Sequence, residues 1–255
     1  MTVRIGLGAC VLHSIEMLSI ARHSGFDFLV LDMEHTHATL EEVAVMSIAG
    51  LECGFPVHIR VPHCRSEAIT RAVDCGAHTL IVPHVDSVAD AVSIVDRVRF
   101  PPVGNRSIPS PIAVTGFRPV PVADLMRRSE AHLKLTVMIE SKEALADVAG
   151  IAAVKGVDTL MIGTNDLAAS LGYTGLLTHP EVKAAFATIA RAAHANGKNF
   201  SVIGLPQGMI GSHAIANGAT EIVVTNEINL LFDASVLCVS NARAAVAEAA
   251  RAASG

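Results

Sequence analysis

The chain alternates between two kinds of segment. Short runs dominated by valine, isoleucine and leucine are each followed by an amphipathic, alanine-rich stretch with helical periodicity. Because almost every position in the apolar runs is apolar, we expect strands that are buried on both faces, as in a parallel sheet covered by helices. The expected strands are residues 4–9, 27–33, 56–61, 78–83, 135–140, 158–163, 200–205 and 220–225.

The number of these units indicates the fold. Eight strand–helix units in 255 residues are typical of an α/β fold of the TIM type, a closed (β/α)8 barrel. A doubly wound open sheet is the alternative, but no GxGxxG motif follows the first strand. We see no domain boundary and expect a single domain over residues 1–255. Glycines at the helix ends are expected to take the left-handed conformation that turns the chain toward the next strand; they are Gly25, Gly54, Gly76, Gly156, Gly197 and Gly218.

Two segments depart from the repeating pattern. Residues 100–122 are rich in proline, glycine and serine, and irregular segments of this length in compact domains are usually functional or disordered. Because this segment follows the fourth unit, we expect it on the rim of the barrel, followed by a short helix at 125–133. The last stretch of the chain predicts a C-terminal helix over residues 231–253.

Composition narrows the classes of function. The net charge is −5 and only 4% of residues are aromatic, which disfavours binding to nucleic acid or to an anionic membrane. We find no apolar run of about 18 or more residues and no secretory signal, so no membrane span is expected. The five cysteines form no CxxC pair, which favours a reducing cytoplasm and buried, small apolar roles for the thiols over a catalytic one.

Polar residues follow most of the expected strands. In a (β/α)8 barrel the catalytic groups stand at the carboxyl ends of the strands, so these residues are expected to form one ring. The second strand, FLVLDM, contains Asp32 and is followed by Glu34, His35 and His37, which belong to this ring. The residues at the strand ends are Asp32, Glu34, His35, His37, Arg60, His63, His84, Glu140, Asp166, Thr225, Asn226 and Glu227.

Glu140 and Asp166 are the best candidates for metal ligands. Each carboxylate directly follows an apolar strand, in VMIE and MIGTND, and a divalent cation would relieve the repulsion between two buried like charges. Ligation by carboxylates alone favours Mg²⁺ or Mn²⁺ over Zn²⁺. The alternative is that each carboxylate caps the next helix or pairs with a base.

The remaining polar residues suggest acid–base and anion-binding roles. His35 and His37 form an HxH pair, but the fifth and sixth strands add no further histidine, so we interpret His37 as a solvent-exposed rim residue. His35, close to Asp32 or Glu34, is better interpreted as an acid–base group oriented by a carboxylate. Arg60 would bind a carboxylate substrate or an enolate, or else pair with those same acids.

The lysines disfavour a Schiff-base mechanism, which needs a lysine within a barrel strand. Lys134 precedes the fifth strand and lies at the wrong end of it. Lys142 follows Glu140 by two residues and is expected to begin a helix.

The chain resembles the HpcH/HpaI aldolases, which are metal-dependent class II pyruvate aldolases. The resemblance rests on DFLVLDMEH, PVHIRVP, GAHTLIVPHVDSVADA, VMIESKEAL and IGTNDLAASLGYTGLLTHPEV, in this order and spacing, and covers residues 3–235. It implies a (β/α)8 barrel, a hexamer built as a trimer of dimers, and a last helix exchanged between subunits. It also implies an enzyme that cleaves a 4-hydroxy-2-oxo acid reversibly to pyruvate and an aldehyde through a metal-bound enolate.

The resemblance implies a role for each site residue. Glu140 and Asp166 would hold Mg²⁺ or Mn²⁺, with Co²⁺ as a further candidate, and His35 would be the acid–base residue with Asp32 as its partner. Arg60 would steady the enolate oxygen. The loop residues Thr164, Asn165 and Asp166 would bind the 2-oxo acid.

Some positions depart from the pattern of this family and leave other activities open. Thr164 stands where the family usually has proline, the rim motif RGVG is replaced by NRSI, and the last strand ends in TNE instead of a GSD-like motif. These changes leave the acceptor aldehyde undetermined. A lyase acting on a CoA ester, a decarboxylase of an oxaloacetate-like acid, and a barrel kept only for binding are the alternatives.

Overall fold

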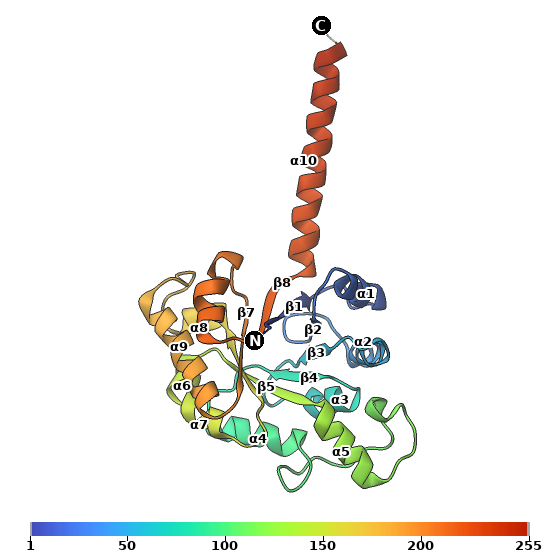
Figure 1. The fold of residues 1–255 in the computed structure, drawn as a ribbon, viewed down its shortest axis with the longest axis vertical. Coiled ribbons are helices and arrows are strands. Elements are labelled where there is room, and N and C mark those ends of the chain that lie inside the picture. Colours follow the sequence, from blue (N-terminus) through green and yellow to red (C-terminus); the bar gives the residue numbers. More distant parts are fainter. Residues whose placement is uncertain (1, 254–255) are drawn as a thin grey trace.

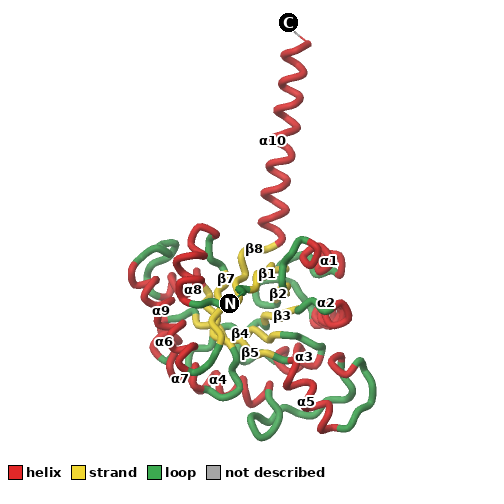
Figure 2. Tube along the Cα trace, viewed as in Figure 1, coloured by secondary structure: helices red, strands yellow, loops and turns green. Residues whose placement is uncertain are grey.

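Eight parallel strands close into a barrel in the computed structural model, which describes residues 2–253. Each strand pairs with its neighbours in sequence, and β8 pairs with β1 to complete the ring (Figures 1 and 2). The expected (β/α)8 barrel is therefore confirmed and the open sheet is wrong. The strands are β1 (Arg4–Ala9), β2 (Phe28–Asp32), β3 (Val57–Arg60), β4 (Thr79–Val82), β5 (Lys134–Ile139), β6 (Thr159–Gly163), β7 (Asn199–Ile203) and β8 (Glu221–Asn226).

Helices surround the strands, and several of them begin at a side-chain cap. Thr39 and Glu42 form a reciprocal capping box at the start of α2, and Ser87 caps α4 through its hydroxyl. All six glycines expected at helix ends have positive φ angles. The helices are α1 (Ile15–His23), α2 (Leu40–Cys53), α3 (Ala68–Asp74), α4 (Val88–Val98), α5 (Val122–His132), α6 (Lys142–Ala146), α7 (Val148–Ala153), α8 (Thr164–Ser170), α9 (Pro180–Ala195) and α10 (Glu227–Ala253).

The seventh unit has no regular helix. Where a helix was expected after β7, the chain forms three short helical turns, Gln207–Met209, Ile210–Ala214 and Ile215–Asn217. Glycines at 208 and 211 lower the helical propensity there. The helix expected after β5 is likewise divided into α6 and α7.

The middle of the barrel interior is apolar, and charged side chains lie at both of its ends. Phe28 fills the part of the interior nearer the amino-terminal ends of the strands. It lies beside Gly6, and a Cβ added to Gly6 would lie 2.2 Å from the Phe28 ring. Val30, Ile81 and Met138 form the next part of this inner cluster. Asp32 and Arg60, paired residues of β2 and β3, close it at the carboxyl end. The strand register also places a charged pair, Arg4 and Glu221, at the amino-terminal end, where the Arg4 guanidinium lies over the Phe28 ring.

The irregular segment 100–122 lies away from that opening, which corrects the expectation that it forms part of the rim. Arg106 donates to Asp74, the last residue of α3, over 2.6 Å, and the Asn105 backbone donates to the Asp96 carbonyl. The physical reason is that α4 runs back along the barrel, so the connection after it begins at the amino-terminal end. The short helix expected next is α5.

The helix α10 projects from the barrel (Figure 1) and starts four residues earlier than expected. Only Glu227 of this helix is buried within the described residues. By length and composition alone α10 could cross a membrane, but core helices of soluble proteins and signal sequences meet the same two criteria. Its exposed large apolar residues are Ile228, Leu230, Leu231, Phe232, Val236, Leu237, Val239 and Val246.

Candidate active site

A cavity of about 580 Å³ opens at the carboxyl end of the barrel. The strand ends of β2, β3, β6 and β8 form its walls, and the connection after β7 closes one side. Every residue predicted for the site lines this cavity except Glu140, which lies behind Gly163 in its wall. The lining residues that were predicted are Asp32, His35, Arg60, Thr164, Asn165 and Asp166.

Arg60 is held by two carboxylates. Its Nε and Nη2 donate to the two oxygens of Asp32 over 2.8 and 2.6 Å, and its Nη1 lies 3.0 Å from Glu34 Oε2. Burial opposes the charge of Arg60, but the hydrogen bonds and negative charge of Asp32 outweigh it and raise the pKa of the guanidinium. Arg60 is therefore a fixed, permanent positive charge at the floor of the cavity.

Asp32 is paired with Arg60, which corrects the expected pairing of Asp32 with His35. Asp32 and Arg60 are opposite residues in neighbouring strands, so both side chains point into the barrel. His35 lies beyond the strand end, and its Nε2 is 3.7 Å from the Glu34 carboxylate. Its side chain is 64% exposed, so the imidazole reaches into the cavity and meets solvent.

His84 joins the carboxylates Glu34 and Glu140. Its Nε2 lies 2.7 Å from Glu34 Oε1 and its Nδ1 lies 3.3 Å from Glu140 Oε1. The His84 backbone N–H also donates to Glu140 Oε1 over 2.6 Å. The residue has a φ of 55°, an uncommon conformation for a non-glycine residue, and histidine is among the residues that adopt it more readily. This turn brings both the N–H and the ring of His84 to Glu140.

Glu140 is a buried carboxylate whose two oxygens have different surroundings. It is only 5% exposed. Burial raises the pKa of its carboxyl; the His84 N–H and ring oppose this, and the charges of Glu34 and Asp166 add to it. While Oε1 accepts from His84, Oε2 lies against Gly163, where an added Cβ would come within 2.5 Å. Gly163 thus leaves room at this oxygen that any side chain would fill.

Asp166 and its neighbours form the wall next to Glu140. β6 ends at Gly163 and α8 begins at Thr164, so Asp166 lies in the first turn of α8. The Thr164 hydroxyl donates to the Ile203 carbonyl over 2.7 Å, which ties this turn to β7. Asp166 is exposed to the cavity. The two carboxylates thus follow adjacent strands, and the charge of Asp166 helps to raise the pKa of Glu140.

Comparison with known proteins identifies the family. The model of the HpcH/HpaI aldolase/citrate lyase family matches residues 10–220. The chain belongs to this family. The resemblance found from sequence motifs is thereby confirmed, and the match includes every predicted site residue.

Two curated relatives of this chain are aldolases. The chain is 34% identical over 193 residues to the 4-hydroxy-4-methyl-2-oxoglutarate aldolase of Hapsidospora irregularis, covering 74% of this chain and 71% of that protein. It is 37% identical over 186 residues to the hydroxypyruvate/pyruvate aldolase of Pseudomonas aeruginosa, covering 72% and 68%. The fold of the HpcH/HpaI aldolase from Desulfitobacterium hafniense DCB-2 matches with a TM-score of 0.88 at 24% identity, over 95% of this chain and 93% of that one.

Glu227 binds the backbone of the loop that follows β1. Its carboxylate accepts from the backbone N–H groups of Cys10, Val11 and Leu12 over 2.6–3.0 Å. The acid that replaces the GSD-like motif of the family therefore fixes the loop after β1.

The cavity offers no activated thiol or amine within residues 2–253. Burial, followed by the charges of Glu227 and Asp32, raises the pKa of the Cys10 thiol to about 11. A thiol with this pKa is protonated at neutral pH and is a poor nucleophile. No lysine is among the described lining residues, and Lys134 is exposed at the start of β5.

Sequence reasoning did not assign Glu34 and His84 to the site, although both were noted at strand ends. Their contacts reach across the ends of four strands: Glu34 forms ion pairs with Arg60 and His84, and His84 forms one with Glu140. The sequence did offer one signal. A single carboxylate cannot accept from all the N–H donors of a buried arginine, so a buried Arg60 would need a second partner.

Proposed function

We propose that this protein is a class II aldolase that cleaves a 4-hydroxy-2-oxo acid to pyruvate, or a related 2-oxo acid, and an aldehyde. It is an aldehyde-lyase, in keeping with the curated aldolases that share its family. The observation that carries the proposal is the arrangement of two carboxylates, a fixed guanidinium and an exposed imidazole around one cavity. Each of these has a task in aldol cleavage.

Glu140 and Asp166 are proposed to hold a divalent cation. The residues fit the ion because both donors are oxygen, His84 fixes one oxygen of Glu140, and Gly163 leaves room at the other. Such an all-oxygen set suits Mg²⁺ or Mn²⁺, with Co²⁺ as a further candidate. When bound there, the cation supplies Lewis acidity toward the oxygens of the 2-oxo acid.

Arg60 and the turn at the start of α8 are proposed to bind the 2-oxo acid. Asp32 and Glu34 hold the guanidinium with its charge in place, so it stabilises negative charge on the enolate oxygen without moving. Thr164 and Asn165 lie beside Asp166 in the cavity wall, where they contact the carboxylate end of the substrate. In this proposal Asp32 positions Arg60.

His35 is proposed to carry the proton. In cleavage, its imidazole takes the proton of the 4-hydroxyl group, the C3–C4 bond breaks, and the aldehyde leaves. The electron pair of that bond remains on the 2-oxo acid as an enolate, which is then protonated at C3 to give pyruvate. Glu34, 3.7 Å away, stabilises the imidazolium formed in the first step.

Removal of metal tests this function. We expect EDTA to abolish pyruvate release from 5-keto-4-deoxy-D-glucarate, a 4-hydroxy-2-oxo acid in the names of related aldolases, and Mg²⁺ or Mn²⁺ to restore it. The assay couples pyruvate to lactate dehydrogenase, and a panel of aldehydes supplied with pyruvate or hydroxypyruvate identifies the acceptor. Pyruvate release that is indifferent to EDTA, or borohydride trapping of pyruvate on a lysine, would overturn the proposal.

The whole chain is proposed to act as one domain in a cytoplasmic homo-oligomer, a hexamer in which α10 packs on a neighbouring subunit. Phe232, Val236 and Val239 share one side of α10 with Arg243 and line a shallow groove. Exposed apolar surface of this extent is costly unless it is covered. Its burial by a second subunit accounts for the helix without a membrane.

We expect the double variant Phe232→Glu, Val236→Glu to elute as a smaller species than the parent protein. Two buried charges without partners oppose association strongly. Size-exclusion chromatography with light scattering gives the mass, and Asn241→Glu, which adds a charge at a polar position of α10, is the matched control. An unchanged mass for the double variant would show that this side of α10 is not an interface.

A further inference from the structure

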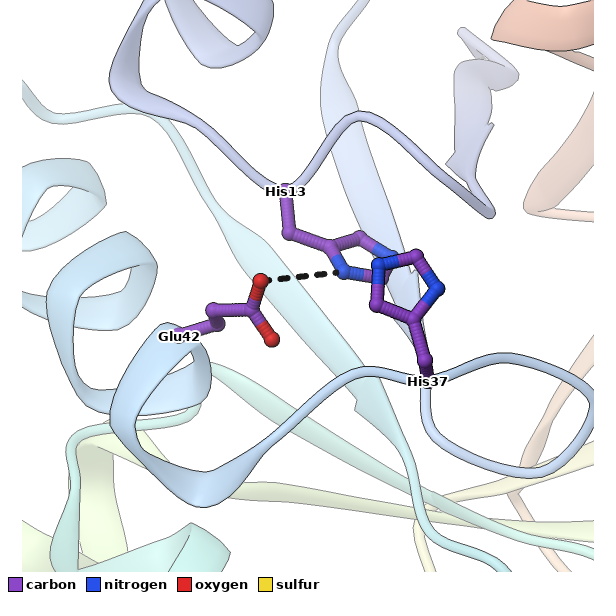
Figure 3. A group of neighbouring side chains, drawn as sticks. All are labelled: His13, His37 and Glu42. Atoms are coloured by element: carbon purple, nitrogen blue, oxygen red, sulfur yellow. Dashed lines mark ion pairs between the residues drawn. The ribbon is translucent and has the colours of Figure 1, made fainter.

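A second group of possible metal ligands lies outside the cavity. His13, His37 and Glu42 converge on one another (Figure 3), and each offers a donor atom within 4.8 Å of the others. His13 comes from the connection after β1, His37 from the connection after β2, and Glu42 from the first turn of α2. Three segments of the chain thus place two imidazoles and a carboxylate together, and the proposed aldol chemistry uses none of them.

His13 gives the strongest indication of a missing partner. Its side chain is 1% exposed, and neither of its ring nitrogens has a hydrogen-bond partner. The Glu42 carboxylate oxygen lies 3.5 Å from Nδ1, beyond the usual length of a hydrogen bond. A buried imidazole without partners is costly, and a coordinated cation would satisfy one of its nitrogens.

Glu42 is oriented by its own helix cap. Its Oε2 accepts from the Thr39 backbone N–H over 2.7 Å and from the Thr39 hydroxyl over 3.0 Å. These bonds leave Oε1 directed toward His13. Metal-binding carboxylates are commonly held by such outer hydrogen bonds, which fix the oxygen that coordinates. The capping box therefore orients Glu42 as a ligand.

We propose that His13, His37 and Glu42 form a Zn²⁺ site that is separate from the oxygen-only site of Glu140 and Asp166. Two histidines and one carboxylate are a recognised zinc ligand set with a fourth position for water. Imidazole donors favour Zn²⁺ over Mg²⁺, in contrast to the carboxylates in the cavity. Zn–N bonds of about 2.0–2.1 Å place neighbouring ligand atoms roughly 3.3 Å apart. The exposed ring of His37 is free to make that approach.

The ion would join two connections at the mouth of the barrel. His37 follows His35 by two residues, and His13 follows the loop that Glu227 fixes. Coordination would therefore hold the connection after β2 against the one after β1, next to the proposed acid–base residue.

Zinc binding to the full-length protein tests this site directly. The double variant Glu140→Gln, Asp166→Asn serves as the background, so that the cavity carboxylates do not contribute. In equilibrium dialysis we expect one Zn²⁺ per chain, and His37→Ala or Glu42→Gln in this background should weaken binding by at least about 10²-fold. His37 is exposed and glutamine can keep the capping box, so both variants should fold.

The matched control is His23→Ala, which removes an exposed histidine of α1 whose Nδ1 lies within hydrogen-bond distance of Ser19. Zinc affinity in this control should stay unchanged. Substituted Co²⁺ should give the intense visible absorption of a four-coordinate site, lost with His37. The absence of stoichiometric zinc in the background variant, or equal affinity with and without His37 and Glu42, would overturn the proposal. Neither result depends on aldolase turnover.

Discussion

Replacing Glu140 by glutamine is expected to lower aldol turnover by roughly 10³-fold and to weaken binding of Mn²⁺. Lewis-acid stabilisation is worth several kcal/mol at the transition state, and about 1.4 kcal/mol corresponds to a factor of ten in rate. The amide keeps an oxygen for the His84 N–H, so the fold should survive. Steady-state kinetics, Mn²⁺ titration followed by electron paramagnetic resonance, and thermal melting measure the three quantities.

Two further variants test whether the effect is specific to Glu140 and to the space beside it. Glu143→Gln changes an exposed carboxylate of α6 in the same way and should leave turnover unchanged. Gly163→Ala adds a Cβ within 2.5 Å of Glu140 Oε2 and should weaken Mn²⁺ binding although no ligand is removed. If Glu140→Gln had the same turnover and Mn²⁺ affinity as the parent protein, Glu140 would not be a ligand of the metal.

The change His35→Ala is expected to slow turnover by about 10²–10⁴-fold, the usual contribution of a positioned acid–base group. The imidazole is largely exposed and makes one long contact with Glu34, so its removal should cost little stability. Because the proton moves in the transition state, kcat and kcat/KM should fall together while Mn²⁺ binding is retained.

His23→Ala again provides a matched control, because it removes an exposed imidazole far along α1 from the cavity. A parent-like rate for His35→Ala would exclude the acid–base role. A loss confined to KM would instead indicate that His35 only binds the substrate.

The positions of the site residues along the strands could be predicted from sequence, but their partners could not. An apolar run that ends in a charged residue marks the point where a barrel strand leaves the core, and this rule located Asp32, Arg60, Glu140 and Asp166. The pairing of Asp32 with Arg60 depends on the register between β2 and β3. A shift of this register would have given Asp32 a different partner.

His84 shows a second limit of the sequence. Its position after β4 was evident, but its contact with Glu140 requires a backbone conformation that non-glycine residues seldom adopt. The segment 100–122 shows a third limit. Its composition correctly predicted an irregular connection, whereas its place at the amino-terminal end follows from the direction of α4. Glu227 looked like a member of the polar ring and instead fixes a loop.

The exchange of the methyl protons of pyruvate with D₂O tests the central claim most directly, because it reports enolisation without an aldehyde. Proton NMR follows the exchange in the presence of Mg²⁺. We expect rapid exchange with the parent protein, and none above background with EDTA, with Glu140→Gln or with Asp166→Asn. Exchange at the parental rate in either variant would show that these two carboxylates do not hold the ion that promotes enolisation.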